Sequence, residues 1–228
     1  SLGDGLIEHM NGVYQFFKRI KSEIPDIIIE NCSTGGSRLE PKMMSVTAMS
    51  SFSDAHESIE VPVIAANMHY LISPRQSQIW CVLKDSFTEN HMRYVIVSGF
   101  LGRLCWSGTI DKLSDWQIDM LKSAENFYED ASDIIKDGRS YIYRTDFINN
   151  RKPQGTQAVV RYSRDKSRVL IVCHYFNNAK KMSIELGGDY GLEKSLYDTR
   201  AYVDNGSLTF CGNSIDADVF ILKRKGGI

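Results

Sequence analysis

The sequence lacks any apolar run long enough to cross a membrane. A membrane-spanning helix needs about 18 consecutive apolar residues, and the longest runs here, such as residues 169–173, have the length of a strand. The sequence also lacks an excess of charge, since 27 Lys and Arg balance 28 Asp and Glu. This balance argues against a broad nucleic-acid or anionic-membrane surface. With 43% hydrophobic and 24% charged residues among 228, the composition excludes a mainly disordered or collagen-like chain.

Cysteine is scarce, and its spacing is wide. No two of the five thiols form the CxxC pair of a zinc site or a redox motif. Four of them lie in apolar stretches and are predicted to be small buried hydrophobes, whereas Cys32 lies in a polar loop. The first residues show no basic start followed by an apolar core, the pattern of a signal peptide. We therefore predict a reducing, cytoplasmic location and no metal or organic cofactor.

Strand and helix patterns alternate over the first 110 residues. Apolar residues three and four positions apart predict a helix over residues 7–24, which Pro25 ends. The β-branched run Ile27 to Ile29 predicts a strand buried on both faces. The same criteria predict strands over 46–53, 78–83 and 100–106, and helices over 59–72 and 89–98. This alternation is typical of a parallel α/β architecture.

The pattern changes at about residue 140, where we place a domain boundary. Before it, Ser114 and Gln117 form a capping box that predicts the start of a helix, and Gly138 lies where that helix should end. After it, short strand candidates follow one another with turns and no helix between them. They cover residues 157–162, 168–176, 182–186, 194–197, 201–203, 207–210 and 217–223. Asn205-Gly206 is a two-residue hairpin signal. The pattern predicts an antiparallel sandwich or barrel.

Two polar loops each follow a predicted buried strand, where parallel folds carry their functional groups. Glu30 to Arg38 offers a thiol, hydroxyls, a guanidinium and backbone N–H groups that its glycines leave accessible, although composition alone favours a plain polar turn. Ser53 to Glu57 places Asp54 at a strand end as a candidate general acid or base, with a helix N-cap as the alternative.

The other candidates are single residues with two interpretations each. Arg75 could orient a carboxylate or lie at an interface, and Trp106 could stack on a sugar ring or pack in the core. We interpret His69, His91 and His174 as structural. The sequence contains no phosphate-binding P-loop, no G-x-S-x-G elbow and no H-E-x-x-H zinc motif.

Together the two loops resemble glycoside hydrolase family 36, the microbial α-galactosidases. The family's first loop is roughly E-N-C-S-S-G-G-x-R-F-D-P-x-M, and residues 30–44 are E-N-C-S-T-G-G-S-R-L-E-P-K-M-M. Its acid/base loop is roughly W-T-S-D, and residues 51–54 are S-F-S-D. The two patterns align without a gap from Glu30 to Asp54. The resemblance covers residues 1 to about 140, and the remainder only by architecture.

The resemblance implies an α/β plus all-β fold. Residues 1–140 would form the second half of a (β/α)8 TIM barrel, and residues 141–228 an antiparallel β-sandwich domain. Asp54 matches the family's general acid/base at the end of the sixth barrel strand. Cys32 and Gly35 match residues that contact the galactose ring, and Ser33 lies beside them. The implied reaction is retaining hydrolysis of a terminal α-galactoside.

Two departures from the family pattern stand out. Ser51 and Phe52 replace its tryptophan and threonine, which leaves another α-linked sugar, such as an α-N-acetylgalactosaminide, as an alternative substrate. The nucleophilic aspartate of a K-x-D-x-N-like strand does not occur in residues 1–228. We therefore expect a C-terminal fragment that is inactive alone. Its exposed sheet edges would be covered by the missing N-terminal portion or by another copy in a homo-oligomer.

Two further classes of function remain as alternatives. A non-catalytic carbohydrate-binding protein would use aromatics of the C-terminal region such as Tyr175, Phe176, Tyr197 or Tyr202, although alternation places most of these in the core. A purely structural domain predicts that Asp54→Asn has no functional effect. If the chain is part of a glycosidase or is a carbohydrate-binding protein, its partner is a galactoside or another oligosaccharide, not a nucleic acid or a membrane.

Overall fold

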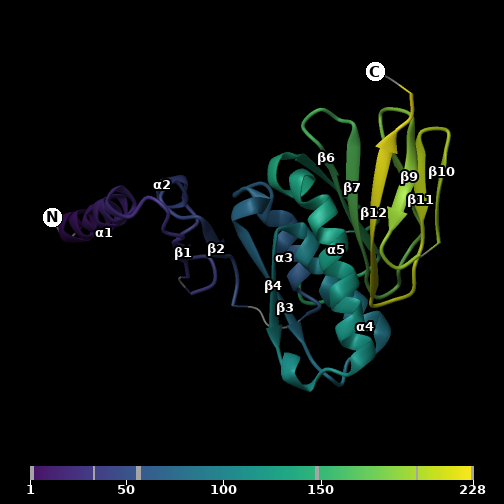
Figure 1. Ribbon diagram of the computed structural model, residues 1–228, viewed down its shortest axis with the longest axis horizontal. Coiled ribbons are helices and arrows are strands. Elements are labelled where there is room, and N and C mark those ends of the chain that lie inside the picture. The colour runs from purple at the N-terminus through teal and green to yellow at the C-terminus, as the bar shows by residue number, and fades with distance from the viewer. Residues whose placement is uncertain (1–2, 33, 55–57, 147–148, 199, 227–228) are drawn as a thin grey trace.

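The computed structural model describes residues 3–226 except 33, 55–57, 147–148 and 199. Figure 1 shows three parts: an N-terminal helix that stands apart, a parallel sheet with its helices, and antiparallel sheets at the C-terminal end. None of the helices in the described residues is both long and apolar enough to cross a membrane.

The first sheet has four parallel strands in the order β1-β2-β3-β4. These strands are Glu30–Asn31, Met49–Ser51, Ser77–Leu83 and Arg103–Gly108. Helical segments connect them, as parallel pairing requires: α2 (Pro41–Met44), α3 (Val61–Met68), η1 (Pro74–Gln76), α4 (Glu89–Ser98) and η2 (Gly99–Leu101). After β4, η3 (Ile110–Lys112) leads into α5 (Asp115–Asp137). The predicted strand–helix alternation is confirmed, and α4 has the predicted bounds.

The prediction for Ile27 to Ile29 is wrong. These residues lie outside any strand, and the Ile28 side chain is 65% exposed. The strand β1 that follows has only two residues and pairs with β2 alone among the described residues. A β-branched run forms a buried strand only where neighbours cover both of its faces, and here nothing in the described chain does so.

The second region contains two antiparallel sheets. The larger has the order β5-β6-β7-β12-β9, and the smaller β10-β11-β8. The larger consists of Arg139–Arg144, Thr156–Tyr162, Arg168–Tyr175, Asp216–Arg224 and Tyr190–Ser195. The smaller consists of Ala201–Asp204, Ser207–Phe210 and Met182–Glu185. The sequence missed β5, and it placed β9 several residues too late. The predicted hairpin at Asn205-Gly206 is confirmed, since both residues have positive φ, 46° and 75°.

The three central strands of the five-stranded sheet, β6, β7 and β12, are buried on both faces. On one face, Val172 and its partner Val219 join the core that contains residues of α4 and α5. On the other face, Ile171 and its partner Phe220 pack with side chains of the three-stranded sheet. This explains why β6, β7 and β12 carry nearly continuous apolar runs.

Helix α5 packs against that sheet and confirms its predicted cap. The Gln117 side chain accepts a hydrogen bond from the Ser114 backbone N–H at 3.0 Å, which completes the capping box. The buried face of helix α5 consists of Gln117, Leu121, Ala124, Phe127, Ala131, Ile134 and Ile135.

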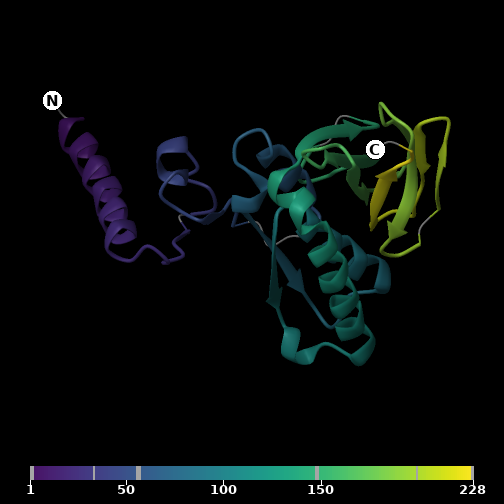
Figure 2. The same cartoon turned by 45° about the horizontal axis from the view of Figure 1, so that its top comes forward.

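Helix α1 (Asp4–Glu23) also has the predicted position, but none of its residues is buried. Its apolar face is open, as Leu6, Ile7, Met10 and Phe16 show. Figure 2, turned by 45°, still shows α1 separated from the sheets. The hydrogen bond from Lys42 Nζ to Asn11 Oδ1, 2.7 Å, ties α1 to α2.

Candidate active site

The two candidate loops leave the sheet side by side. Asn31 at the end of β1 pairs in parallel with Ser50 of β2. The Ser50 hydroxyl donates a hydrogen bond of 2.8 Å to the Asn31 carbonyl oxygen, which fixes this pairing. Residues 32 and 52 therefore begin their loops at the same carboxyl edge of the sheet.

The first loop folds back on itself. Its residues Thr34, Gly35 and Gly36 have φ values of 41°, 58° and 102°. Asn31 Nδ2 donates to the carbonyl oxygen of Arg38 at 2.6 Å, which joins the two ends of the loop. Left-handed backbone at three successive residues favours glycine, so the Gly-Gly pair is a requirement of the turn.

The turn brings Gly35 against the backbone of Asp54. A Cβ added at Gly35 would lie 2.2 Å from Asp54 N and 2.9 Å from Ser53 Cα. One added at Gly36 would lie 2.5 Å from the Phe52 carbonyl oxygen. Only glycine permits this approach, so the loop after β1 and the loop after β2 form a single surface.

The structure therefore brings together most of the residues singled out in the sequence. Asp54 and Cys32 are both exposed at this edge, and Gly35 touches the Asp54 backbone. Ser33 lies outside the described residues, as do the neighbours of Asp54 at 55–57. An exposed carboxyl group at this edge is accessible for proton transfer to a bound ligand.

The remaining thiols have no part in this site. Cys81 and Cys173 are buried, Cys105 and Cys211 are half-buried, and all five cysteines are free. Burial raises the pKa of the Cys81 and Cys173 thiols, which keeps them protonated. Within the described residues, no cluster of three or more His, Cys, Asp or Glu side chains could hold a metal ion.

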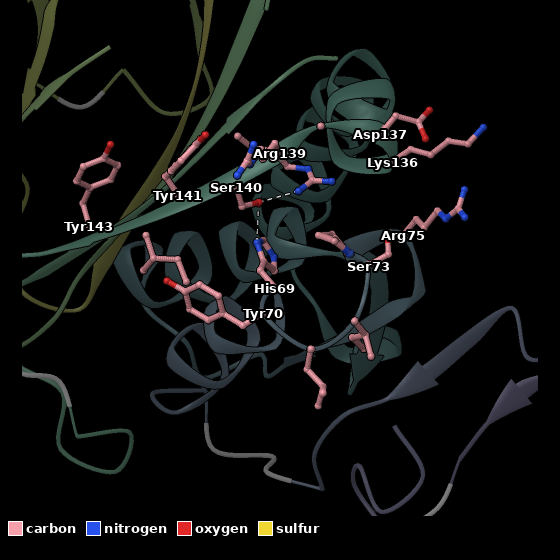
Figure 3. A pocket seen from close by; sticks show the side chains of 16 residues that line it. His69, Tyr70, Ser73, Arg75, Lys136, Asp137, Arg139, Ser140, Tyr141 and Tyr143 are labelled. Atoms are coloured by element: carbon pink, nitrogen blue, oxygen red, sulfur yellow. Dashed lines mark hydrogen bonds between the residues drawn. The ribbon is translucent and has the colours of Figure 1, made fainter. Parts of the chain in front are cut away.

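Arg75 and Trp106 lie elsewhere. Arg75 belongs to η1, directly before β3, and so lies at the opposite, amino-terminal edge of the sheet. It lines a pocket of about 890 Å³ together with Lys136 and Asp137, and Figure 3 shows these three at one end of it. Trp106 packs against the core, and its Nε1 donates to Glu125 Oε1 at 2.7 Å.

The histidines interpreted as structural are hydrogen-bonded inside the fold. His69 lies between the Leu101 carbonyl oxygen (2.5 Å) and the Ser140 hydroxyl (2.9 Å), and burial lowers its pKa to about 4. His91 bonds Ser58 at 2.6 Å. His174 bonds Ser98 at 3.1 Å, and burial lowers its pKa to about 3.

The aromatics considered for sugar binding are mostly internal. Tyr175 and Phe176 are fully buried and Tyr197 is half-buried, whereas Tyr202 is 54% exposed. The sequence interpretation overlooked two exposed tyrosines, Tyr141 and Tyr143 of β5. The signal was present in the alternation of residues 139–144, R-S-Y-I-Y-R.

Solved α-galactosidases share this fold. AgaA from Geobacillus stearothermophilus, in a variant complexed with raffinose, matches with a TM-score of 0.75 and 19% identity over 93% of this chain and 31% of its own. The α-galactosidase from Lactobacillus brevis matches with a TM-score of 0.72 and 18% identity over 95% of this chain and 32% of its own. The fold is thus that of part of a family 36 glycoside hydrolase.

The sequence comparisons identify the family. The α-galactosidase AgaA of Geobacillus stearothermophilus is 28% identical over 174 residues, which are 72% of this chain and 22% of the relative. The family model described as Melibiase matches residues 4–138, more than half of the chain. The chain belongs to the Melibiase family, the family 36 α-galactosidases. It spans between about a fifth and a third of the length of these relatives.

Proposed function

We propose that the chain supplies the general acid/base and part of the sugar-binding surface of a retaining α-galactosidase. Asp54 is the acid/base, and Cys32, Ser33 and Gly35 contact the terminal galactose. The observation that carries the proposal is the contact of Gly35 with the Asp54 backbone, because it joins the two family loops into one surface at the carboxyl edge of a parallel sheet.

The proposed chemistry follows from a carboxyl group in that position. Asp54 protonates the glycosidic oxygen as the bond to the leaving sugar breaks, while a second carboxylate attacks the anomeric carbon. Asp54 then takes a proton from the water that hydrolyses the glycosyl-enzyme. The second carboxylate must lie about 5–5.5 Å from the first.

We propose that the second carboxylate comes from outside these 228 residues. The sequence contains no K-x-D-x-N-like motif, and the chain spans only 22% of the related AgaA. In this proposal residues 1–140 are the second half of a (β/α)8 barrel and residues 141–228 a β-sandwich domain. The isolated chain is then inactive. Full activity in the purified chain would contradict this part of the proposal.

The substrate class is a terminal α-galactoside of an oligosaccharide. The relative AgaA has been solved with raffinose, which carries such a group. Ser51 and Phe52 replace the family's tryptophan and threonine beside the acid/base, so an α-N-acetylgalactosaminide is the alternative. Chromogenic glycosides of the two sugars, compared at equal concentration, decide between them.

The test is the Asp54→Asn variant of the gene product that contains this chain. We expect hydrolysis of raffinose to fall by about 10²–10⁴-fold, the usual contribution of a general acid–base group. Formation of the glycosyl-enzyme from 4-nitrophenyl α-galactoside should fall less, because nitrophenolate leaves without protonation. This difference between leaving groups identifies the acid/base and would be absent for a residue that only binds sugar.

Asp26→Asn is the matched control. Asp26 is exposed like Asp54 but precedes β1, at the opposite edge of the sheet. Its substitution should leave both reactions within about 2-fold, since surface changes away from functional features have small effects. Unchanged raffinose hydrolysis in the Asp54→Asn variant would refute the assignment of Asp54.

A further inference from the structure

Strand β5 carries two exposed tyrosines side by side. It is an edge strand, and its residues alternate between the two faces of the sheet. Tyr141 and Tyr143 are 43% and 37% exposed. Figure 3 shows both extending from the same side of β5, while Ser140 points to the other side, toward His69.

Two further tyrosines complete an aromatic groove. Tyr162 lies with its ring 5.9 Å from that of Tyr141 and 6.2 Å from that of Tyr190, measured between centroids. We call the hollow lined by Tyr141, Tyr143, Tyr162 and Tyr190 the tyrosine groove; its volume is about 560 Å³. This lies within the range of small-molecule sites, about 300–1,000 Å³.

The hydroxyl groups of the two inner tyrosines are engaged in hydrogen bonds inside the fold. The Tyr162 hydroxyl donates to the Leu186 carbonyl oxygen at 2.8 Å, and the Tyr190 hydroxyl donates to that of Lys166 at 2.9 Å. Burial and the neighbouring tyrosines raise the pKa of Tyr162 to about 12. No residue in the described part of the chain forms a hydrogen bond with the hydroxyl of Tyr141 or Tyr143.

The groove exists because the three-stranded sheet packs over strand β6 but leaves the tyrosines of strand β5 exposed. Tyr141 pairs with Val160 and Tyr143 with Ala158, both of which are buried between the two antiparallel sheets. Their β5 partners on the same face remain exposed. Packed aromatic rings of this kind would be expected inside the core, not at its open border.

The charges around the groove favour a neutral, hydroxyl-rich ligand. It is lined by Asp137 and Glu185 as well as by Arg139, Arg164 and Lys166. None of these five forms an ion pair within the described residues. The carboxylates accept hydrogen bonds and the cationic side chains donate them. A sugar hydroxyl, which can donate and accept, can pair with either kind of group.

An anionic ligand is disfavoured by the neighbouring helix. Helix α5 ends at Asp137, so its carbonyl end, the negative end of the helix dipole, faces this region. The nearby buried cation Arg161 is already bound there, with Nε donating to the Ile134 carbonyl oxygen and Nη1 to Ser140 Oγ, each at 2.7 Å. Its donors are therefore engaged with the helix end and with Ser140, and they are not directed at a ligand in the groove.

We propose that the tyrosine groove is a non-catalytic binding site for pyranose units of an oligosaccharide. The rings of Tyr141 and Tyr143 pack against the apolar C–H face of the sugar. The charged side chains that line the groove form hydrogen bonds with the sugar hydroxyls. The groove is separate from the candidate active site. Strand β5 follows α5 directly and lines the same pocket as Arg75, which lies at the amino-terminal edge of the parallel sheet. Asp54 lies at the opposite, carboxyl edge of that sheet. The proposal does not depend on the role of Asp54.

The test measures sugar binding by the chain itself. Binding of raffinose, stachyose and maltotriose is followed by titration calorimetry for wild type, for the double variant Tyr141→Ala/Tyr143→Ala and for Tyr141→Phe/Tyr143→Phe. We expect Kd to rise at least 10-fold in the alanine variant and to stay within about 3-fold in the phenylalanine variant, because the rings carry most of the contact. Circular dichroism checks that each variant is folded.

Two control variants show whether the sugar binds at the tyrosine groove or at another part of the chain. Tyr202→Ala removes a tyrosine that is 54% exposed on the three-stranded sheet, and Asp54→Asn alters the candidate active site. Neither should change Kd. Equal binding by wild type and the alanine variant, or no binding of any of the three sugars, would overturn the proposal. So would displacement of the sugar by inorganic phosphate, or an effect confined to self-association through the β5 edge.

Discussion

Residues 3–54 and the remainder of the chain are packed very differently. In the N-terminal segment, α1 has no buried residue, and β1 and β2 together have five residues. In the remainder, the three central strands β6, β7 and β12 are buried along nearly their whole length. The buried side chains of Leu39, Met44 and Phe52 join the N-terminal segment to the core of the remainder, which we call the body. Two β2–β3 residue pairs add to this contact, as does Gln76, whose Nε2 donates to the Met44 and Thr47 carbonyl oxygens.

The difference shows where the candidate site obtains its geometry. Both candidate loops belong to the thinly packed segment, so the position of Asp54 depends on backbone contacts with Gly35 and on short strand pairing. Functional loops are commonly drawn from such regions of low local stability. The body has the large core and carries the tyrosine groove at its border.

The largest expected effect is on the free energy of unfolding. Phe220 is fully buried between the antiparallel sheets, and Phe220→Ala should cost about 3–5 kcal/mol because it leaves a cavity. Phe16 of α1 is 59% exposed, and Phe16→Ala should cost less than about 0.5 kcal/mol. Urea unfolding followed by circular dichroism measures both. A similar cost for the two variants would show that α1 packs on the body.

The same contrast decides what could be predicted from the sequence. Helices α4 and α5 were predicted closely, because their apolar spacing and the capping box of α5 are local signals. The run Ile27 to Ile29 misled, because burial of a strand depends on neighbours that a local pattern does not contain. Strand β5 was missed because its tyrosines face outward.

The candidate site was predicted in part. Strand order and the polar loops placed Cys32 and Asp54 at one sheet edge, which the parallel pairing of β1 and β2 confirms. The direct approach of Gly35 to the Asp54 backbone was not predicted. It depends on three consecutive positive φ values, and composition alone gives no measure of them.

The second prediction tests how strongly Asp54 depends on that approach. Gly35→Ala places a Cβ against Asp54 N, and a shift of about 1 Å at a catalytic group costs about 100-fold in rate. Gly206→Ala is the control, since its φ of 75° gives similar strain but its Cβ would meet nothing closer than 3.5 Å. Hydrolysis of an α-galactoside by the gene product should fall only in the first variant. Equal rates would separate the loop from catalysis.

The free energy of unfolding should depend on pH through two buried histidines, His69 and His174, both outside the N-terminal segment. Burial lowers the pKa of His69 to about 4 and that of His174 to about 3, from about 6.5 in the unfolded chain. Below pH 6.5 the unfolded chain binds protons at these histidines more readily than the folded chain, so the folded state loses stability as pH falls. Each histidine should lower the free energy of unfolding by about 1.4 kcal/mol for every pH unit below 6.5. This loss continues down to about pH 4 for His69 and about pH 3 for His174. His69→Gln should lower this slope by about 1.4 kcal/mol per pH unit between pH 6.5 and pH 4, as measured by urea unfolding at a series of pH values.

The smallest effects come from two polar contacts, one in each region. Ser114→Ala removes the capping box of α5 and should cost about 1 kcal/mol of unfolding free energy. Asn11→Ala removes the hydrogen bond from Lys42 to α1 and should leave the unfolding free energy of the body unchanged within about 0.5 kcal/mol. Hydrogen exchange of α1 would nevertheless become faster in the Asn11 variant, since local opening there is separate from global unfolding. If Asn11→Ala instead lowered global stability as much as Ser114→Ala, the N-terminal segment would unfold together with the body, and the position of Asp54 would depend on the whole fold.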